Sequence, residues 1–406
     1  MSVKKKPYVL IANYILGLAT SCTVQPMACA HKAPCFPYYL TASKPHQTLC
    51  SLQCFQWILD GSDSSYEEMT KNQPSSLCLQ KKSFSLLHQL AISLLHSHPQ
   101  FSKQQMQSLF VKALLLKSLE SDENFYSLQE RRSLLFSLSA EEAQFLQASY
   151  NLDNFEQMLY LEGGATIFCP IKQRLLANKD ALLSLDFALL FSFCSLSAEK
   201  SSLRSSSFLS LTQKDYLAFE TVWESCHLLS LPKKRAEDAY LFCIEKRAQL
   251  LHWEVKKSND HAMVRLSALL RIFSPQEGSL LKETFRSLSF ADRESILLPF
   301  KEKTGASLLS KNLSSLLIGL FDDPLSGESP KEKLNNIVTQ VLPFIAHIIK
   351  DATEQTELGL LDPHVYLDFQ SASLCAKEHL LDPSELSYQI DKQGNVLLFS
   401  PPEPQK

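Results

Sequence analysis

The sequence predicts a mainly α-helical protein, arranged as a multi-helix bundle or an irregular α-solenoid-like stack, with a short β-hairpin near the C-terminus. Three observations support this fold class. Apolar residues recur at helical spacing through most of the chain, helix-capping signals precede several of these stretches, and only 10 of 406 residues are Gly. A low Gly content disfavours folds rich in tight β-turns, because such turns need positive φ angles.

Three apolar stripes have the spacing of a core-facing helix surface. They run from Leu87 to Leu95, from Ala262 to Phe273 and from Leu334 to Ile349. In each stripe the apolar positions follow the i, i+3, i+4, i+7 pattern, which places them on one side of a helix. Pro343 lies inside the third stripe and lacks a backbone N–H, so it predicts a kink or a division there.

Helix starts are marked by capping boxes, in which a polar residue lies three positions before a Glu that can bond back to it. Three of the four boxes have Pro at the first helical position, where the missing N–H costs nothing. The four pairs are Ser139 with Glu142, Ser274 with Glu277, Ser329 with Glu332 and Asp382 with Glu385.

Strand signals are few and lie mostly near the C-terminus. Residues 388–390 and 396–399 are apolar or β-favouring and flank a short turn that contains Gly394, which predicts a β-hairpin. A further short strand is expected at 165–168, directly after Gly163 and Gly164. That glycine pair also predicts a domain boundary, and the serine-rich stretch 201–207 is another candidate boundary.

These signals divide the chain into six segments. We expect a signal peptide at 1–21, a tether at 22–47, an N-terminal helical domain at 48–162, a C-terminal helical domain at 165–386, the β-hairpin at 387–400 and a disordered tail at 401–406.

The N-terminus has the pattern of an export signal. Lys4, Lys5 and Lys6 precede an apolar run from Val9 to Thr20. This run is too short to span a bilayer, which needs about twenty apolar residues, and it matches the short apolar region of a secretory signal. We therefore expect the protein to leave the cytoplasm.

The residues Leu18 to Cys22 resemble a bacterial lipoprotein box, in which a small residue precedes a Cys at the end of the apolar region. The resemblance implies cleavage before Cys22 and lipid attachment to its sulfur, and hence a membrane anchor at the cell envelope. Here Ala19 stands three positions before the Cys, where the common pattern has Leu. An alternative is cleavage after Ala30, which would release a soluble protein that starts at His31. A third alternative is an N-terminus that is not cleaved.

The sequence contains 11 Cys, and several lie early in the expected mature chain. An exported location permits disulfides, so these residues are candidates for a disulfide or thiol cluster, although their connectivity does not follow from spacing. Cys169, Cys194, Cys226 and Cys243 are instead interpreted as small buried hydrophobes. The cluster candidates are Cys29, Cys35, Cys50, Cys54 and Cys78.

No motif for catalysis, metal binding or a cofactor is recognisable, and the sequence identifies no small-molecule ligand. With a net charge of −3 and thinly spread basic residues, nucleic acid is not an expected partner. We therefore expect a non-enzymatic helical scaffold at the bacterial envelope that binds another protein. Two alternatives are an envelope hydrolase with a site assembled from distant residues, and a soluble secreted protein that acts on a host or neighbouring-cell partner.

Overall fold

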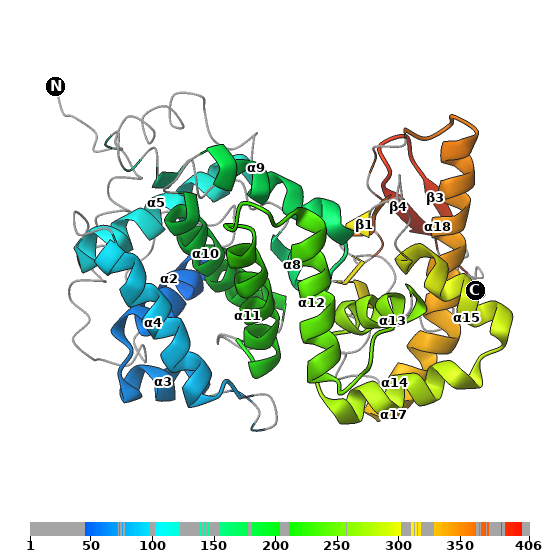
Figure 1. Cartoon of the computed structure of the whole chain (residues 1–406), viewed down its shortest axis with the longest axis horizontal. Coiled ribbons are helices and arrows are strands. Elements are labelled where there is room, and N and C mark those ends of the chain that lie inside the picture. Colours follow the sequence, from blue (N-terminus) through cyan, green and yellow to red (C-terminus); the bar gives the residue numbers. More distant parts are fainter. Residues whose placement is uncertain are drawn as a thin grey trace, which may run out of the picture. The chain divides into compact units, whose positions relative to one another are not determined.

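The computed structural model divides by internal contacts into two compact units, shown in Figure 1. Unit 1 comprises Met1–Asp153 and Ala177–Tyr216, and unit 2 comprises Asn154–Leu176 and Leu217–Lys406. The structure describes residues 45–71, 73, 75, 78–97, 102–121, 139, 142, 145–146, 155–177, 181–203, 211–256, 258–301, 310–311, 313–314, 316–317, 329–362, 365, 367–370, 372, 383 and 386–399.

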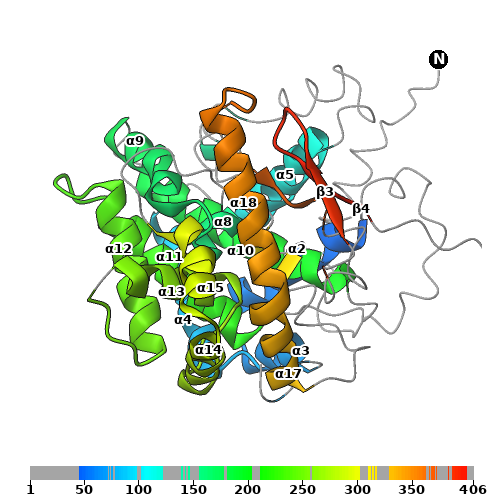
Figure 2. The ribbon, with the colours of Figure 1, turned by 90° about the vertical axis from the view of Figure 1, so that its right-hand side faces the viewer.

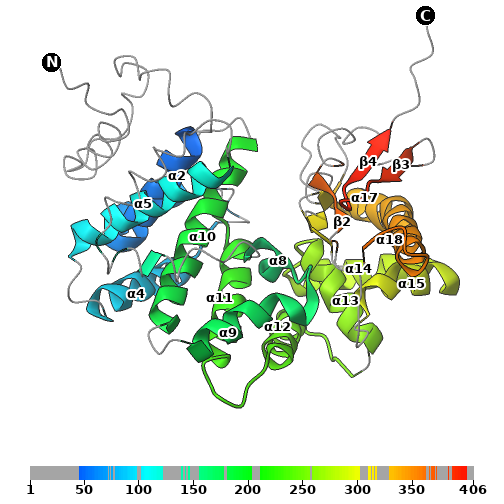
Figure 3. The ribbon, with the colours of Figure 1, turned by 90° about the horizontal axis from the view of Figure 1, so that it is seen from above.

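The described elements of unit 1 are helices. They are α2 (Pro45–Asp60), α3 (Asp63–Thr70), α4 (Lys81–Ser97), α5 (Lys103–Ser121) and α10 (Ala181–Leu203), together with the start of α11 (Gln213–Leu228), which continues into unit 2. Helix α10 packs most extensively on α2 and also contacts α4, and Figure 3 shows α2 beside α5. Because α10 supplies apolar surface to α2, segment 177–216 groups with the N-terminal helices and not with the C-terminal domain expected at 165–386.

Aromatic rings fill the core of unit 1. Phe55 of α2 stacks on Phe110 of α5, with ring centroids 4.2 Å apart, and Phe187 and Phe191 of α10 meet Phe110 edge-on. Such offset and edge-to-face pairs contribute about 0.5–1.5 kcal/mol each beyond their buried area. The same three helices are thus fixed by one aromatic cluster.

A tight turn joins α2 to α3. Gly61 has φ +70°, a conformation that L side chains rarely adopt, and a Cβ there would lie only 2.3 Å from the ring of His88 in α4. His88 Nδ1 donates to the carbonyl of Ile58 over 2.8 Å. The missing side chain of Gly61 therefore lets the imidazole close the end of α2.

Unit 2 contains the other helices that the structure describes, apart from Ala177, the last residue of α9. They are α8 (Phe155–Tyr160), the 3-10 helix η2 (Gly164–Phe168), α9 (Cys169–Ala177), α12 (Ala236–Leu250), α13 (Ser258–Leu269), α14 (Pro275–Ser287), α15 (Phe290–Leu297), η3 (Leu298–Phe300), α17 (Pro330–Asn336), η5 (Ile337–Val341) and α18 (Leu342–Glu357). Helix α12 packs against η2 and α13, and α18 packs against α15. The mainly α-helical fold class predicted from the sequence is confirmed.

The three predicted stripes are largely buried. Leu87 and Leu94 face the core from α4, and Ala262 and Leu266 do so from α13. In the third stripe the apolar residues at helical spacing are buried from end to end. The helix is divided there as Pro343 predicts, because the π-helical turn η5 separates α17 from α18 just before the proline.

Three of the four expected capping boxes form. Ser139, Ser274 and Ser329 each accept a hydrogen bond from the backbone N–H of the Glu three positions later, and that Glu bonds back to the backbone N–H of the Ser. The fourth pair, Asp382 with Glu385, lies outside the described residues.

The predicted C-terminal hairpin is present as β3 (Ser387–Ile390) and β4 (Val396–Phe399), paired antiparallel with Ser387 opposite Phe399. Tyr388 OH donates to a carboxylate oxygen of Asp351 over 3.2 Å, which attaches the hairpin to α18. Figure 2 shows β3 and β4 with α18 in one view. A second, parallel pair joins β1 (Ser310–Lys311) to β2 (Leu367–Asp368).

The strand expected at 165–168 is wrong, because this segment is the 3-10 helix η2. Gly164 has φ +60°, and Thr166 donates its hydroxyl proton to the carbonyl of Gly163 over 2.9 Å. The tight turn directs Ile167 and Phe168 into the core beside α12. Residues 1–44, which include the expected signal peptide and most of the tether, and the tail at 401–406 lie outside the described residues.

Candidate functional site

Only part of the predicted thiol cluster lies in the described chain. Cys22, Cys29 and Cys35 lie outside it, so lipid attachment and two of the cluster positions stay predictions. Cys50 and Cys54 lie one turn apart on α2, and Cys78 precedes α4.

Helix packing places Cys54 near a cysteine that the sequence had suggested only as a buried hydrophobe. Cys54 in α2 and Cys194 in α10 are both fully buried, and the neighbouring Cys54 thiol adds to the effect of burial on the Cys194 thiol. Burial raises the pKa of the Cys194 thiol well above its usual value. Cys78 instead interacts with the hydroxyl of Tyr66, whose pKa is raised chiefly by burial.

Within the described chain, no three His, Cys, Asp or Glu side chains gather closely enough to bind a metal ion. Among the same residues, every helix is too short or too polar to cross a bilayer.

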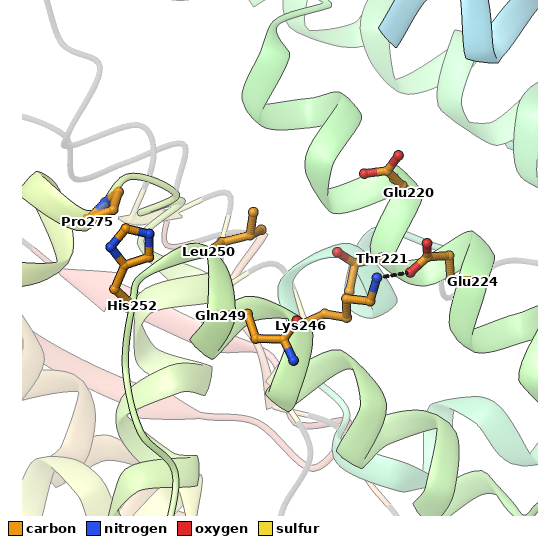
Figure 4. Close-up of a pocket in the computed structure, with 8 residues that line it drawn as sticks. All are labelled: Glu220, Thr221, Glu224, Lys246, Gln249, Leu250, His252 and Pro275. Atoms are coloured by element: carbon orange, nitrogen blue, oxygen red, sulfur yellow. Dashed lines mark ion pairs between the residues drawn. The ribbon is translucent and has the colours of Figure 1, made fainter. Parts of the chain in front are cut away.

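A pocket of about 360 Å³ opens on unit 2 between the C-terminal half of α11 and the end of α12 (Figure 4). Its polar end is formed by Glu220, Thr221 and Glu224 of α11 with Lys246 of α12. Lys246 Nζ lies 2.7 Å from a carboxylate oxygen of Glu224. His252 lies at the other end, beside Pro275, and has φ +54°.

This pocket does not assemble the pair of groups that the hydrolase alternative requires. An imidazole base must lie within hydrogen-bonding reach of its carboxylate or nucleophile, at about 2.6–3.2 Å. In Figure 4 the imidazole of His252 is separated from Glu220 and Glu224 by the side chains of Leu250 and Lys246. The ion pair with Glu224 also places the ammonium of Lys246 against a carboxylate and not against the imidazole.

Three largely buried arginines lie in unit 2, and two of them contact the end of α8 and the segment that links it to η2. Arg265 of α13 donates to the carbonyls of Leu161, Glu162 and Phe300 at 2.9–3.1 Å. Leu161 has φ +57°, so these hydrogen bonds stabilise a backbone turn that is unfavourable for leucine. Arg271 places its guanidinium 4.3 Å from the ring centroid of Tyr160, at the end of α8.

Arg247 of α12 has the least usual surroundings of the three arginines. Its side chain is 2% exposed, and its guanidinium stacks on the ring of Phe273 at 3.6 Å. Among the described residues, none accepts a hydrogen bond from its three side-chain nitrogens. Burial lowers the pKa of Arg247 to about 9. A buried cation without hydrogen-bond acceptors lowers the free energy of unfolding, so we expect Arg247 to destabilise unit 2.

The end of α18 carries the most exposed apolar group of the described chain. The helix stops in a Schellman motif: the N–H of Gly359 donates to the carbonyl of Thr356, and the N–H of Leu360 donates to the carbonyl of Gln355. Gly359 has φ +72°, as this motif requires. The chain therefore reverses direction with Leu358 before the glycine and Leu360 after it.

These two leucines are 74% and 68% exposed, and we call them the leucine tip. In most Schellman motifs the residue at the Leu360 position packs on an apolar side chain three or four positions before the helix cap. Here those positions hold Gln355 and Glu354, so Leu360 lacks this contact. Leu361, the next residue, returns to the core at 3% exposure.

Acidic residues flank the leucine tip in the sequence. Glu354 and Glu357 precede it on the last turn of α18, and Asp362 follows it. Glu354 pairs with the exposed Lys350 over 3.7 Å, so the acidic groups remain in excess. The leucine tip therefore places two exposed apolar side chains in a negatively charged stretch of the chain.

The chain gives no significant match to family models, to curated proteins or to solved structures. Its function is therefore inferred from its residues and their geometry.

Sequence reasoning did not identify the leucine tip or the burial of Cys54 near Cys194. A signal for the first was present, because Gly359 followed by Asp362 and Pro363 has the composition of a helix stop. The exposure of its leucines was not predictable, since the same pattern usually ends in a buried contact. The proximity of the two cysteines has no local sequence signal, because they lie on distant helices.

Proposed function

We propose that this chain is an exported, lipid-anchored envelope protein that acts as a non-enzymatic helical scaffold and binds another protein through the leucine tip. The single observation that supports binding is the exposure of Leu358 and Leu360 at the end of a helix whose other apolar side is buried. Contiguous exposed apolar surface rimmed by polar residues can mark an interaction site, and the two leucines lie two residues apart at one helix end.

The chemistry of the tip defines the partner. Two closely spaced leucines fit a small apolar pocket, and the surrounding Glu354, Glu357 and Asp362 favour basic residues at its rim. We therefore propose a protein partner with an apolar pocket bordered by Lys or Arg.

Site-specific photocrosslinking in the native cells tests this binding mode. A photoreactive side chain is placed at position 360 of the full chain, and a matched control carries it at Lys331, an exposed position of α17. We expect one discrete adduct from position 360, which excess wild-type protein suppresses and the Leu358→Ser, Leu360→Ser double variant does not. Equal adducts from both positions, or equal competition by the variant, would refute the leucine tip as the binding site.

The mass of the mature N-terminus tests export separately. Cleavage at the lipoprotein box predicts a chain that starts at Cys22 with acyl chains on it, recovered in the membrane fraction. A chain that starts at His31 without lipid would contradict anchoring but keep export. Intact Met1 in the cytoplasmic fraction would contradict both, whatever the crosslinking result.

A further inference from the structure

The pocket between α11 and α12 has the composition of a site for a small organic cation. Its volume of about 360 Å³ lies at the lower end of the range for small-molecule sites. Glu220 and Glu224 lie on successive turns of α11, and Lys246 of α12 faces them. Among the residues that line the pocket, carboxylates therefore outnumber lysine and arginine side chains. This excess of negative charge favours a positively charged ligand.

One ammonium group already lies at the polar end of this pocket. Lys246 Nζ is 2.7 Å from a carboxylate oxygen of Glu224 and 5.4 Å from the ring centroid of Phe242. A carboxylate and an aromatic face both attract a primary ammonium. The side chains of Lys246 and Glu224 are 39% and 33% exposed, so solvent reaches this ion pair. An ammonium group that arrives from solution can therefore compete for the same carboxylate.

Two further features favour a cation beside Glu220. Carboxylates four positions apart on a helix repel each other, so a cation between Glu220 and Glu224 lowers this repulsion. The pocket also includes the end of α12, which closes at Leu251. The helix dipole contributes partial negative charge at such an end. Both effects disfavour an anionic ligand.

The rest of the pocket fits an apolar group. Leu250 lies between the carboxylates and the opposite end, where Pro275 lies beside His252 (Figure 4). The hydroxyl of Thr221 donates to the carbonyl of Leu217 over 2.8 Å, so this donor is already used within α11. A short hydrocarbon chain can therefore contact Leu250 and Pro275 while its ammonium group lies at the acidic end.

We propose that this pocket binds a small primary ammonium compound with a short apolar chain, and that Glu220 together with Glu224 holds its ammonium group. The site differs from the leucine tip on α18, and the proposal depends neither on that tip nor on export. Because the two glutamates and Leu250 come from different helices, the site exists only in the folded chain. The ligand should therefore stabilise unit 2 by mass action.

Ligand-observed NMR on the full wild-type chain tests the charge requirement. Pentylammonium, 1-pentanol and pentanoate have chains of similar length and differ in the charge of the polar end. We expect pentylammonium to bind at least about fivefold more tightly than 1-pentanol, as a partly exposed ion pair allows, and pentanoate to bind most weakly. Equal binding of the ammonium and the alcohol, or tighter binding of pentanoate, would overturn the proposal.

Photolabelling locates the site without any substitution. An alkylammonium probe with a diazirine on its chain is irradiated with the wild-type protein, and labelled tryptic peptides are identified with and without excess pentylammonium. We expect label that pentylammonium suppresses in peptide 215–233, which contains both glutamates, and in peptide 248–256, which contains Leu250 and His252. If the suppressed label lies only in other peptides, the assignment to this pocket is overturned.

Charge variants test the individual side chains by the same NMR titration. Glu220→Gln should weaken pentylammonium binding at least about fivefold, whereas Glu245→Gln, at an exposed position of α12 outside the pocket, should not. Lys246→Met should strengthen binding, because it releases Glu224 for the ligand. Lys233→Met removes the same charge from an exposed position and should leave binding unchanged. Equal losses in both glutamine variants, or weaker binding in Lys246→Met, would overturn the proposal.

Discussion

Replacing Gly61 by Ala tests the turn that closes α2. The added Cβ would occupy space now filled by the His88 ring, 2.3 Å from Nδ1, and the backbone would keep φ +70°. Two costs then combine. A non-glycine residue in this conformation costs about 1–2 kcal/mol, and displacing His88 leaves the Ile58 carbonyl without its donor, at about 1–3 kcal/mol. We expect a loss of roughly 2–5 kcal/mol for unit 1.

Two further variants separate these costs. Gly359→Ala, at φ +72° with no atom within 4 Å of the place that its Cβ would occupy, should show the backbone cost alone, about 1–2 kcal/mol. In a His88→Ala background, Gly61→Ala should also cost only the backbone term of about 1–2 kcal/mol, because the His88 ring that the new Cβ would strike is absent. The difference between the two backgrounds is the steric coupling.

Hydrogen exchange at increasing denaturant, resolved by peptide, measures the opening free energy of α2 and α4 in unit 1 and of α18 in unit 2. Each variant's loss of opening free energy is measured against wild type. If Gly61→Ala loses no more than Gly359→Ala does, the predicted clash with His88 is refuted. Equal effects of Gly61→Ala with and without His88 would refute the role of the imidazole.

Two other substitutions probe unit 2 by denaturant unfolding. Arg247→Met should stabilise the unit by about 1–4 kcal/mol at pH 7, because it removes a buried cation that lacks acceptors. The pKa of Arg247 falls from its ordinary value to about 9 on folding, so the unfolded state binds this proton more tightly, and the wild type should gain stability as pH rises above about 9. The advantage of the variant should therefore shrink above pH 9, and a destabilised Arg247→Met would instead reveal an unrecognised partner of the guanidinium. Ser274→Ala should cost about 0.5–2 kcal/mol through loss of the α14 cap, whereas Ser279→Ala, exposed on the same helix, should stay within about 0.5 kcal/mol of wild type; similar losses in both would contradict the capping role.

The helices were predictable where the decisive contacts are local. The box of Ser274 and Glu277 joins residues three positions apart, and Pro343 acts on the turn directly before it, so both are recognisable without a fold. The strand expected at 165–168 failed because its β-favouring residues follow Gly164, whose positive φ and contact with α12 favour a 3-10 turn.

The candidate sites were less predictable for the same reason. Cys54 was recognised as a thiol of interest together with its neighbours in sequence, whereas the packing of α10 on α2 buries it near Cys194. Arg247 lies at a position of the buried stripe of α12. Because arginine is charged, a prediction from periodicity would nevertheless have placed its side chain at the surface.

The sequence by itself determined the helical class, the starts of several helices, the division at Pro343 and the C-terminal hairpin. Only the tertiary structure decided which cysteines are buried, which arginine is buried without acceptors among the described residues, and which leucines remain exposed at the end of α18. Capping and periodicity depend on residues within one or two turns of each other, whereas burial and side-chain partners depend on helices that are brought together from distant parts of the chain.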